Sequence, residues 1–150
     1  MPISIAGSGT ITGISVGGIP DGVVDTDVLA ANAVTYAKIG TTEQGQLCKA
    51  WVNFNGTGAV AIRASFNVSS ITDNGGGDYT VNFTTAFADA NYAMTGTASL
   101  DGRSETIAIT GYTEATRLSG SVRINSRYNN NLVPNGINVD TSTVAVAVFR

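Results

Sequence analysis

Residues 50–85 read AWVNFNGTGAVAIRASFNVSSITDNGGGDYTVNFTT. Apolar residues alternate with polar or small ones at 60–66, which is the period of a strand with one buried and one exposed face, and the strand expected at 50–54 leads into the first turn. The segments 55–58 (NGTG) and 74–77 (NGGG) interrupt the apolar runs, and Asn and Gly tolerate the positive φ angles of tight hairpin turns. The stretch therefore predicts consecutive antiparallel strands joined by short turns.

The same pattern continues toward the end of the chain, and helix signals are nearly absent. We expect strands at 50–54, 60–66, 68–73, 79–84, 92–100, 106–111, 118–125 and 143–149. Seven or eight short strands within about 100 residues predict an all-β fold, an antiparallel β-sandwich domain over residues 47–150.

Residues 1–46 have a different composition. They hold one aromatic residue, Tyr36, and their formal charge equals the whole net charge of -3. A ten-residue repeat spaces large aliphatic side chains by five residues, a period of neither helix nor strand. They are Val24, Leu29, Val34 and Ile39. Because one chain cannot bury such a ridge, we expect an extended attachment and oligomerisation arm packed against its own copies, with a disordered linker as the alternative.

Composition excludes several classes of function. The chain has no His and one Cys, which excludes a Ser-His-Asp or Cys-His nucleophile and an ordinary His/Cys zinc site. The pI of about 4.6 disfavours binding to nucleic acid. No apolar run approaches the roughly 18 residues of a membrane span, and the first residues lack a signal-peptide pattern. We expect no cofactor and no membrane insertion.

The stretch 50–85 resembles a segment that recurs in tail-fibre and other structural proteins of tailed bacteriophages. Residues 86–99 (AFADANYAMTGTAS) and 144–150 (VAVAVFR) resemble later parts of the same module, and the arm is similar to fibre shaft repeats. The resemblance implies a virion component, commonly a homotrimer, with its amino end at the particle and its carboxy-terminal domain outward. The chain is much shorter than a long tail fibre, so a baseplate fibre, a tail-tip piece and a capsid spike all remain open.

Three features invite a ligand-binding interpretation. Trp51 could stack on a sugar, but its place between Ala50 and Val52 favours a position in the core. The loop 73–78 could hold calcium, but it lacks the regular ligand spacing of a dedicated loop and favours a plain hairpin turn. The acidic residues of the arm, Asp21, Asp25 and Asp27, could share a cation on a trimer axis or form a solvated surface.

The segment 125–136 is the most polar part of the expected outer domain, and we expect it to be a long loop. Tyr offers an apolar face with a hydroxyl, and Asn offers a donor and an acceptor together, which suits glycan binding. An ordinary loop rich in turn formers is the alternative. The expected receptor-binding residues are Tyr112, Arg127, Tyr128, Asn129, Asn130, Asn131 and Asn135.

These observations favour a non-enzymatic, tail-fibre-like virion protein that adheres to the host cell surface. Its expected partners are two further copies of itself, a virion protein that grips the arm, and a host surface glycan or protein. A capsid decoration, head spike or baseplate linker without receptor contact is the alternative. A glycan-processing enzyme is least favoured, because no acidic residue stands in a recognisable catalytic context.

Overall fold

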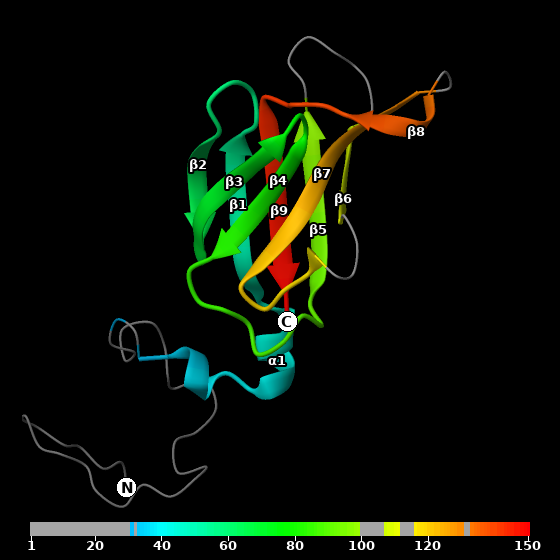
Figure 1. Cartoon of the computed structure of the whole chain (residues 1–150). Coiled ribbons are helices and arrows are strands. Elements are labelled where there is room, and N and C mark those ends of the chain that lie inside the picture. Colours follow the sequence, from blue (N-terminus) through cyan, green and yellow to red (C-terminus); the bar gives the residue numbers. More distant parts are fainter. Residues whose placement is uncertain (1–30, 32, 100–106, 112–115, 131–132) are drawn as a thin grey trace, which may run out of the picture. The chain divides into compact units, whose positions relative to one another are not determined.

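The computed structural model describes residues 31, 33–99, 107–111, 116–130 and 133–150. The chain divides into two units, Met1–Gly40 and Thr41–Arg150, and every strand of the described residues belongs to the second unit (Figure 1). The boundary expected at residue 46 falls at the end of helix α1 (Thr41–Gln46), which is part of the second unit.

Two short helices precede the strands, so an extended conformation throughout residues 1–46 is wrong for these segments. A 3-10 helix, η1, spans Tyr36–Lys38, and the α-helix α1 spans Thr41–Gln46. Ala, Lys, Glu and Gln have high helix propensity, and Glu43 lies in the first turn of α1, where a negative charge complements the helix dipole.

The strands of the described residues form one continuous antiparallel sheet. Its order is β2-β1-β9-β5-β6-β7-β4-β3, with β8 paired to β7. The bounds are β1 Cys48–Asn55, β2 Ala61–Phe66, β3 Val68–Gly75, β4 Asp78–Phe83, β5 Ala93–Ser99, β6 Ile107–Gly111, β7 Ser121–Asn130, β8 Val133–Asn138 and β9 Thr143–Phe149. The all-β prediction is confirmed, as are the hairpin at 74–77 and the turn between β1 and β2.

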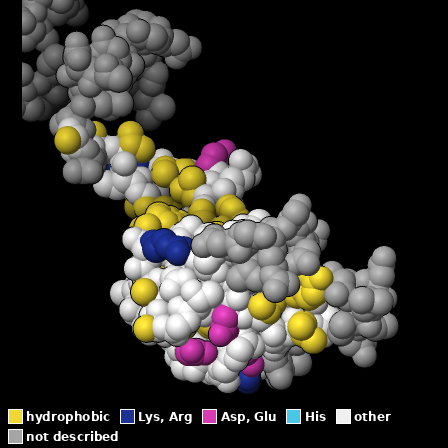
Figure 2. Space-filling model, turned by 90° about the horizontal axis from the view of Figure 1, so that it is seen from above, with side chains coloured by type: hydrophobic (Ala, Val, Ile, Leu, Met, Phe, Trp, Pro, Cys, Tyr) yellow, Lys and Arg dark blue, Asp and Glu magenta, His cyan; other side chains and the backbone are white. Residues whose placement is uncertain are grey.

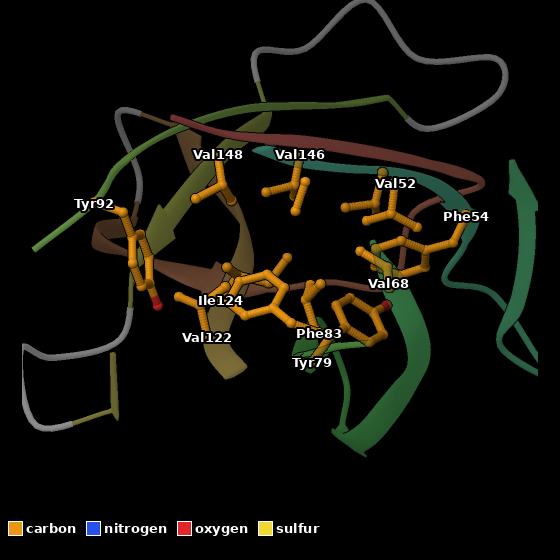
Figure 3. Close-up of a cluster of buried hydrophobic side chains, with 13 residues drawn as sticks. Val52, Phe54, Val68, Tyr79, Phe83, Tyr92, Val122, Ile124, Val146 and Val148 are labelled. Carbon is orange, nitrogen blue, oxygen red and sulfur yellow. The ribbon is translucent and has the colours of Figure 1, made fainter. Parts of the chain in front are cut away.

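The sheet curves so that β1 and β9 face β4 and β7 across the core (Figures 1 and 3). Alternate residues of β1, β9, β4 and β7 point inward, and these inward residues are almost entirely buried. They are Ala50, Val52 and Phe54 from β1, Val144, Val146 and Val148 from β9, Tyr79, Val81 and Phe83 from β4, and Val122 and Ile124 from β7. Figure 3 shows Val52, Val146 and Val148 pointing toward Tyr79, Val122 and Ile124.

The structure overturns the buried face expected at 60–66. All six residues of β2 are exposed, and Phe66 retains 55% of its accessible surface. The reason is the position of β2 at the end of the strand order, where β1 is its one paired strand among the described residues. Alternation predicts burial only where another layer covers the strand.

Tyr79 and its hydrogen-bond partner Asp140 connect three segments at one end of the domain. These are the turns at 55–58 and 74–77 and the segment between β8 and β9 that contains Asp140. The Tyr79 hydroxyl lies 2.9 Å from the Gly56 carbonyl oxygen and 2.9 Å from Asp140 Oδ1, and the Gly77 amide donates to that same Oδ1 at 2.7 Å. A Cβ atom at Gly56 would stand 2.4 Å from Tyr79 Oη, and Gly77 has a φ of 65°. The turns at 55–58 and 74–77 therefore require glycine at these positions.

Asn67 fixes the corner between β2 and β3. Its φ of 53° is left-handed, which Asn tolerates better than most residues. Its side-chain amide donates to the carbonyl oxygens of Lys49 and Thr85, and its Oδ1 accepts from the Thr85 amide at 2.7 Å. One side chain thus joins the start of β1 to the chain that follows β4.

We predict that Asn67→Ala destabilises the domain more than Asn67→Gly. Both variants lose the three side-chain hydrogen bonds, but alanine also bears the cost of a left-handed backbone, about 1–2 kcal/mol. Urea denaturation followed by circular dichroism measures the two free energies of unfolding. An alanine variant as stable as the glycine variant would contradict this account of the corner.

We also predict that the domain loses stability as pH rises above about 10, the pKa of an exposed tyrosine. Burial raises the pKa of Tyr92 to about 12 and, with the hydrogen bond to Asp140, raises the pKa of Tyr79 further. The unfolded chain therefore releases protons that the folded chain keeps, so alkali favours unfolding. Denaturation midpoints measured from pH 9 to pH 12 should fall, and midpoints that stay constant would contradict the prediction.

Candidate functional site

An open groove of about 420 Å³ lies on the outer face of β1, β9 and β5. Its volume falls within the range of small-molecule sites. It is lined by Trp51, Val52, Asn53, Thr95, Gly96, Thr97, Ala145, Val146 and Ala147.

The strand register builds the groove from two rows of side chains. Trp51 is paired with Ala147 on β9, and Ala147 is paired with Thr95 on β5. In the next row Asn53, Ala145 and Thr97 are paired in the same way. The alanines in the centre keep the floor low, while the indole stands on one side and the threonine hydroxyls on the other.

Trp51 forms the apolar wall of the groove. Its side chain is 40% exposed, so the expected core position is wrong. Because Ala50 and Val52 point inward, the residue between them must point outward. Phe66, paired with Trp51 across the β1–β2 ladder, is 55% exposed and extends this aromatic surface beyond the groove.

The outer face of β3, β4 and β7 is polar. Asn82 donates to the hydroxyls of Ser70 and Thr72 at 3.1 and 3.0 Å. Asp78 forms a two-point ion pair with Arg123, with N–O distances of 2.8 and 2.6 Å, and the Arg123 hydrogen bond holds the pKa of the Asp78 carboxyl below its usual value. Polar groups that bond to one another leave fewer donors and acceptors for a ligand, and this distinguishes the polar face from the groove.

The expected long loop at 125–136 is wrong. β7 continues to Asn130 and β8 begins at Val133, so the segment is a hairpin with its strands paired from Arg127 and Asn138 onward. Asn125 and Ser126 are buried, because β7 lies between β6 and β4 at this point. The run of asparagines suggested a loop. β7 nevertheless extends through these residues, because its backbone pairs with β6 on one side and with β4 and β8 on the other.

Of the expected receptor residues, the structure describes the side chains of Arg127 and Tyr128. Arg127 and Tyr128 are half-buried, and Arg127 Nη2 donates to the Gly136 carbonyl oxygen at 3.4 Å. Asn129, Asn130 and Asn135 belong to the β7 and β8 backbones, while their side chains lie outside the described part of the structure. Tyr112 and Asn131 lie outside the described residues altogether.

The arm residues fall into two groups. Val24 and Leu29, together with Asp21, Asp25 and Asp27, lie outside the described residues. Val34 is 59% exposed, and Ile39 is half-buried and closes η1 through a bond from its amide to the Tyr36 carbonyl oxygen.

Within the described residues, no group of three or more His, Cys, Asp and Glu side chains could hold a metal ion. No helix in this part of the chain has the length and apolar character that a membrane crossing requires. Asp73 caps its own turn by accepting from the Gly75 amide at 2.9 Å, which agrees with a plain hairpin at 73–78.

Sequence reasoning missed most of the groove, namely Asn53, Thr95, Thr97, Ala145 and Ala147. A signal was present in TVAVAVF at 143–149, where alanine recurs at every second position between buried valines. Alanine at successive outward positions of a central strand indicates a shallow floor. Which strands flank that floor depends on sheet order, and the sequence pattern does not specify the order.

Comparison of the chain with protein-family models, with curated proteins and with solved structures finds no match. The function must therefore be argued from the groove and its surroundings.

Proposed function

We propose that the chain is a non-enzymatic, tail-fibre-like virion protein whose outer domain binds a host surface glycan in the Trp51 groove. The observation that carries the proposal is the combination of a half-exposed indole with an amide and two hydroxyls around a floor of alanine. A sugar ring presents C–H groups to an aromatic face and hydroxyls to its edges. The indole of Trp51 can contact the C–H groups. The side chains of Asn53, Thr95 and Thr97 can form hydrogen bonds to the hydroxyls.

The domain that presents the groove is, in this proposal, a β-sandwich. One layer is β2, β1, β9 and β5, and the other is β3, β4 and β7, with β6 connecting them. The packing of Val52 and Val146 against Tyr79 and Val122 supports this interpretation (Figure 3). A rigid sheet is a favourable support for a ligand, because its side chains are held by the ladder rather than by a loop.

The low charge of the surface supports adhesion rather than catalysis. On the face shown in Figure 2, charged side chains are few and lie scattered between uncharged atoms. Within the groove itself no lining residue can act as a general acid or base.

A purely structural virion component is the second candidate. The exposed Ile62 and Phe66 on β2 favour it, because an apolar edge strand also suits packing against another subunit. The two candidates differ in whether Trp51 contacts sugar or protein.

We predict that the wild-type protein binds immobilised bacterial lipopolysaccharide, capsular polysaccharide or teichoic acid, and that Trp51→Ala weakens this binding by roughly tenfold. Trp51→Phe should lose less, since it keeps an aromatic face. Leu118→Ala is the matched control, because it removes an apolar side chain that is 55% exposed and lies outside the groove. Biolayer interferometry measures the affinities.

Loss of binding in the Leu118 control, or equal binding by wild type and Trp51→Ala, would contradict the groove as the site. Failure of the wild type to bind any of the three preparations would overturn glycan adhesion and favour the structural candidate.

The proposed assembly is a homotrimer in which Val24, Leu29, Val34 and Ile39 face their own copies. The exposure of Val34 supports a surface available to other subunits. Sedimentation equilibrium at micromolar concentration should give three times the 15.3 kDa chain mass. Val34→Asp should lower that mass, while Thr35→Asp, at an exposed neighbour outside the ridge, should not. A wild-type mass of one chain would contradict the trimer.

A further inference from the structure

Arg63 lies at one end of the Trp51 groove because of an irregularity in β2. Asn53 is paired with Ala64 and Phe54 with Ile62, so Arg63 has no partner residue on β1. Extra residues of this kind redirect a side chain out of the regular alternation. The Arg63 side chain reaches across β1 to the start of β9.

The guanidinium of Arg63 is held next to the groove by uncharged acceptors. Nη1 lies 3.3 Å from Asn53 Oδ1 and 3.4 Å from Thr143 Oγ1, and Nη2 donates to the Ser142 carbonyl oxygen at 2.6 Å. Asn53 is itself a wall of the groove, so the cation and the wall are in direct contact. These bonds orient the guanidinium without neutralising it.

No carboxylate of the described residues forms an ion pair with Arg63. The pairs found in this part of the chain are Arg123 with Asp78, on the opposite outer face, and Arg150 with Asp89. An arginine that is positioned by hydrogen bonds and has no counter-ion among the described residues has the chemistry of an oxyanion-binding group, because its planar fork matches a carboxylate or a phosphate.

The whole layer around the groove has one sign of charge. The strands β1, β2, β9 and β5 contain no Asp or Glu, and their charged residues are Lys49 and Arg63. Trp51 and Asn53 share the outward side of β1 by alternation, and Arg63 is bonded to that side through Asn53. The described strands around the groove therefore contribute positive and no negative charge in a chain whose net charge is -3, which favours an anionic ligand over about one Debye length, ~10 Å at moderate salt.

We propose that the groove binds an acidic glycan, with Arg63 contacting an oxyanion of the sugar while Trp51 stacks on the ring. The inference rests on the proposed glycan adhesion and adds the charge class of the ligand. The oxyanion is a sugar carboxylate or a phosphate of the glycan, and both offer the paired oxygens that a guanidinium recognises.

The test uses the full chain and the three immobilised preparations named above: lipopolysaccharide, capsular polysaccharide and teichoic acid. Lipopolysaccharide and capsular polysaccharide are each presented in native form, after chemical reduction of their carboxyl groups, and after removal of their phosphate substituents. Teichoic acid, whose chain is linked through phosphodiesters, is presented in native form only. We expect the affinity for the native form to exceed the affinity for one of the two neutralised forms by about tenfold or more. The form that loses affinity identifies carboxylate or phosphate as the oxyanion.

Arg63→Gln should lose most of that preference while retaining the weaker binding of the neutralised form. Arg63→Lys, which keeps the charge but not the fork, should be intermediate. Arg150→Gln is the matched control, since it removes the same charge from the end of β9 and no groove residue. Arg63 also forms hydrogen bonds to β1 and to the start of β9, so its substitution can lower the stability of the fold. Thermal unfolding of each variant separates such a loss of stability from a loss of affinity.

Equal affinity of the wild type for native and neutralised forms would overturn the acidic ligand while leaving glycan adhesion through Trp51 intact. A full preference retained by Arg63→Gln would overturn the role of Arg63. Absence of binding to every form would overturn both this inference and the proposed function. Where the wild type binds, Trp51→Ala should weaken native and neutralised forms alike, which separates the contribution of the indole from that of Arg63.

Discussion

Burial of Ala50, Val52 and Phe54 on one face of β1 forces Trp51 and Asn53 onto the other face. Successive side chains of a strand point to opposite faces, so the burial of alternate residues in the core is enough to place Trp51 and Asn53 on the outer face. β9 obeys the same constraint, because burying Val144, Val146 and Val148 turns its alanines outward. The side-by-side pairing of β1 and β9 then places the indole beside a floor of small residues. The groove is thus a consequence of how the core is filled.

The two outer faces of the domain have different chemistry. On β3, β4 and β7 polar side chains bond to one another, as Asn82 does with Ser70 and Thr72, so these partners already satisfy part of their hydrogen-bonding capacity. On β1, β2 and β9 the outward residues include the exposed aromatic side chains of Trp51 and Phe66, two alanines and Arg63, and exposed apolar surface of this kind gains most from an external partner. In the proposed function, the aromatic wall, the hydroxyl edges and a cation that forms no ion pair with a carboxylate of the described residues are the groups that contact an acidic sugar. The face of β1, β9 and β5 is then the binding face of the domain.

Sequence reasoning could predict the local features and not the sheet order. The glycines at 56 and 77 mark turns whose backbone geometry leaves no room for a side chain, so those hairpins were predictable. Trp51 was wrongly expected in the core from its place between Ala50 and Val52, because the residue between two inward-pointing residues of a strand points outward. The exposure of β2 and the hairpin at 125–136 depend on which strands lie beside them, which local pattern does not encode. The groove combines β1, β9 and β5, segments far apart in the chain, and therefore required the structure.

Trp51 is the one tryptophan of the chain, so its fluorescence reports on the groove alone. The most direct measurement is the titration of the wild-type protein in solution with the surface polysaccharide preparations, following Trp51 emission and its quenching by acrylamide. The account predicts a saturable change in emission and protection from the quencher, over the concentrations at which the immobilised preparations bind. Binding of polysaccharide with unchanged emission and unchanged quenching would contradict it, because the sugar would then lie away from the indole.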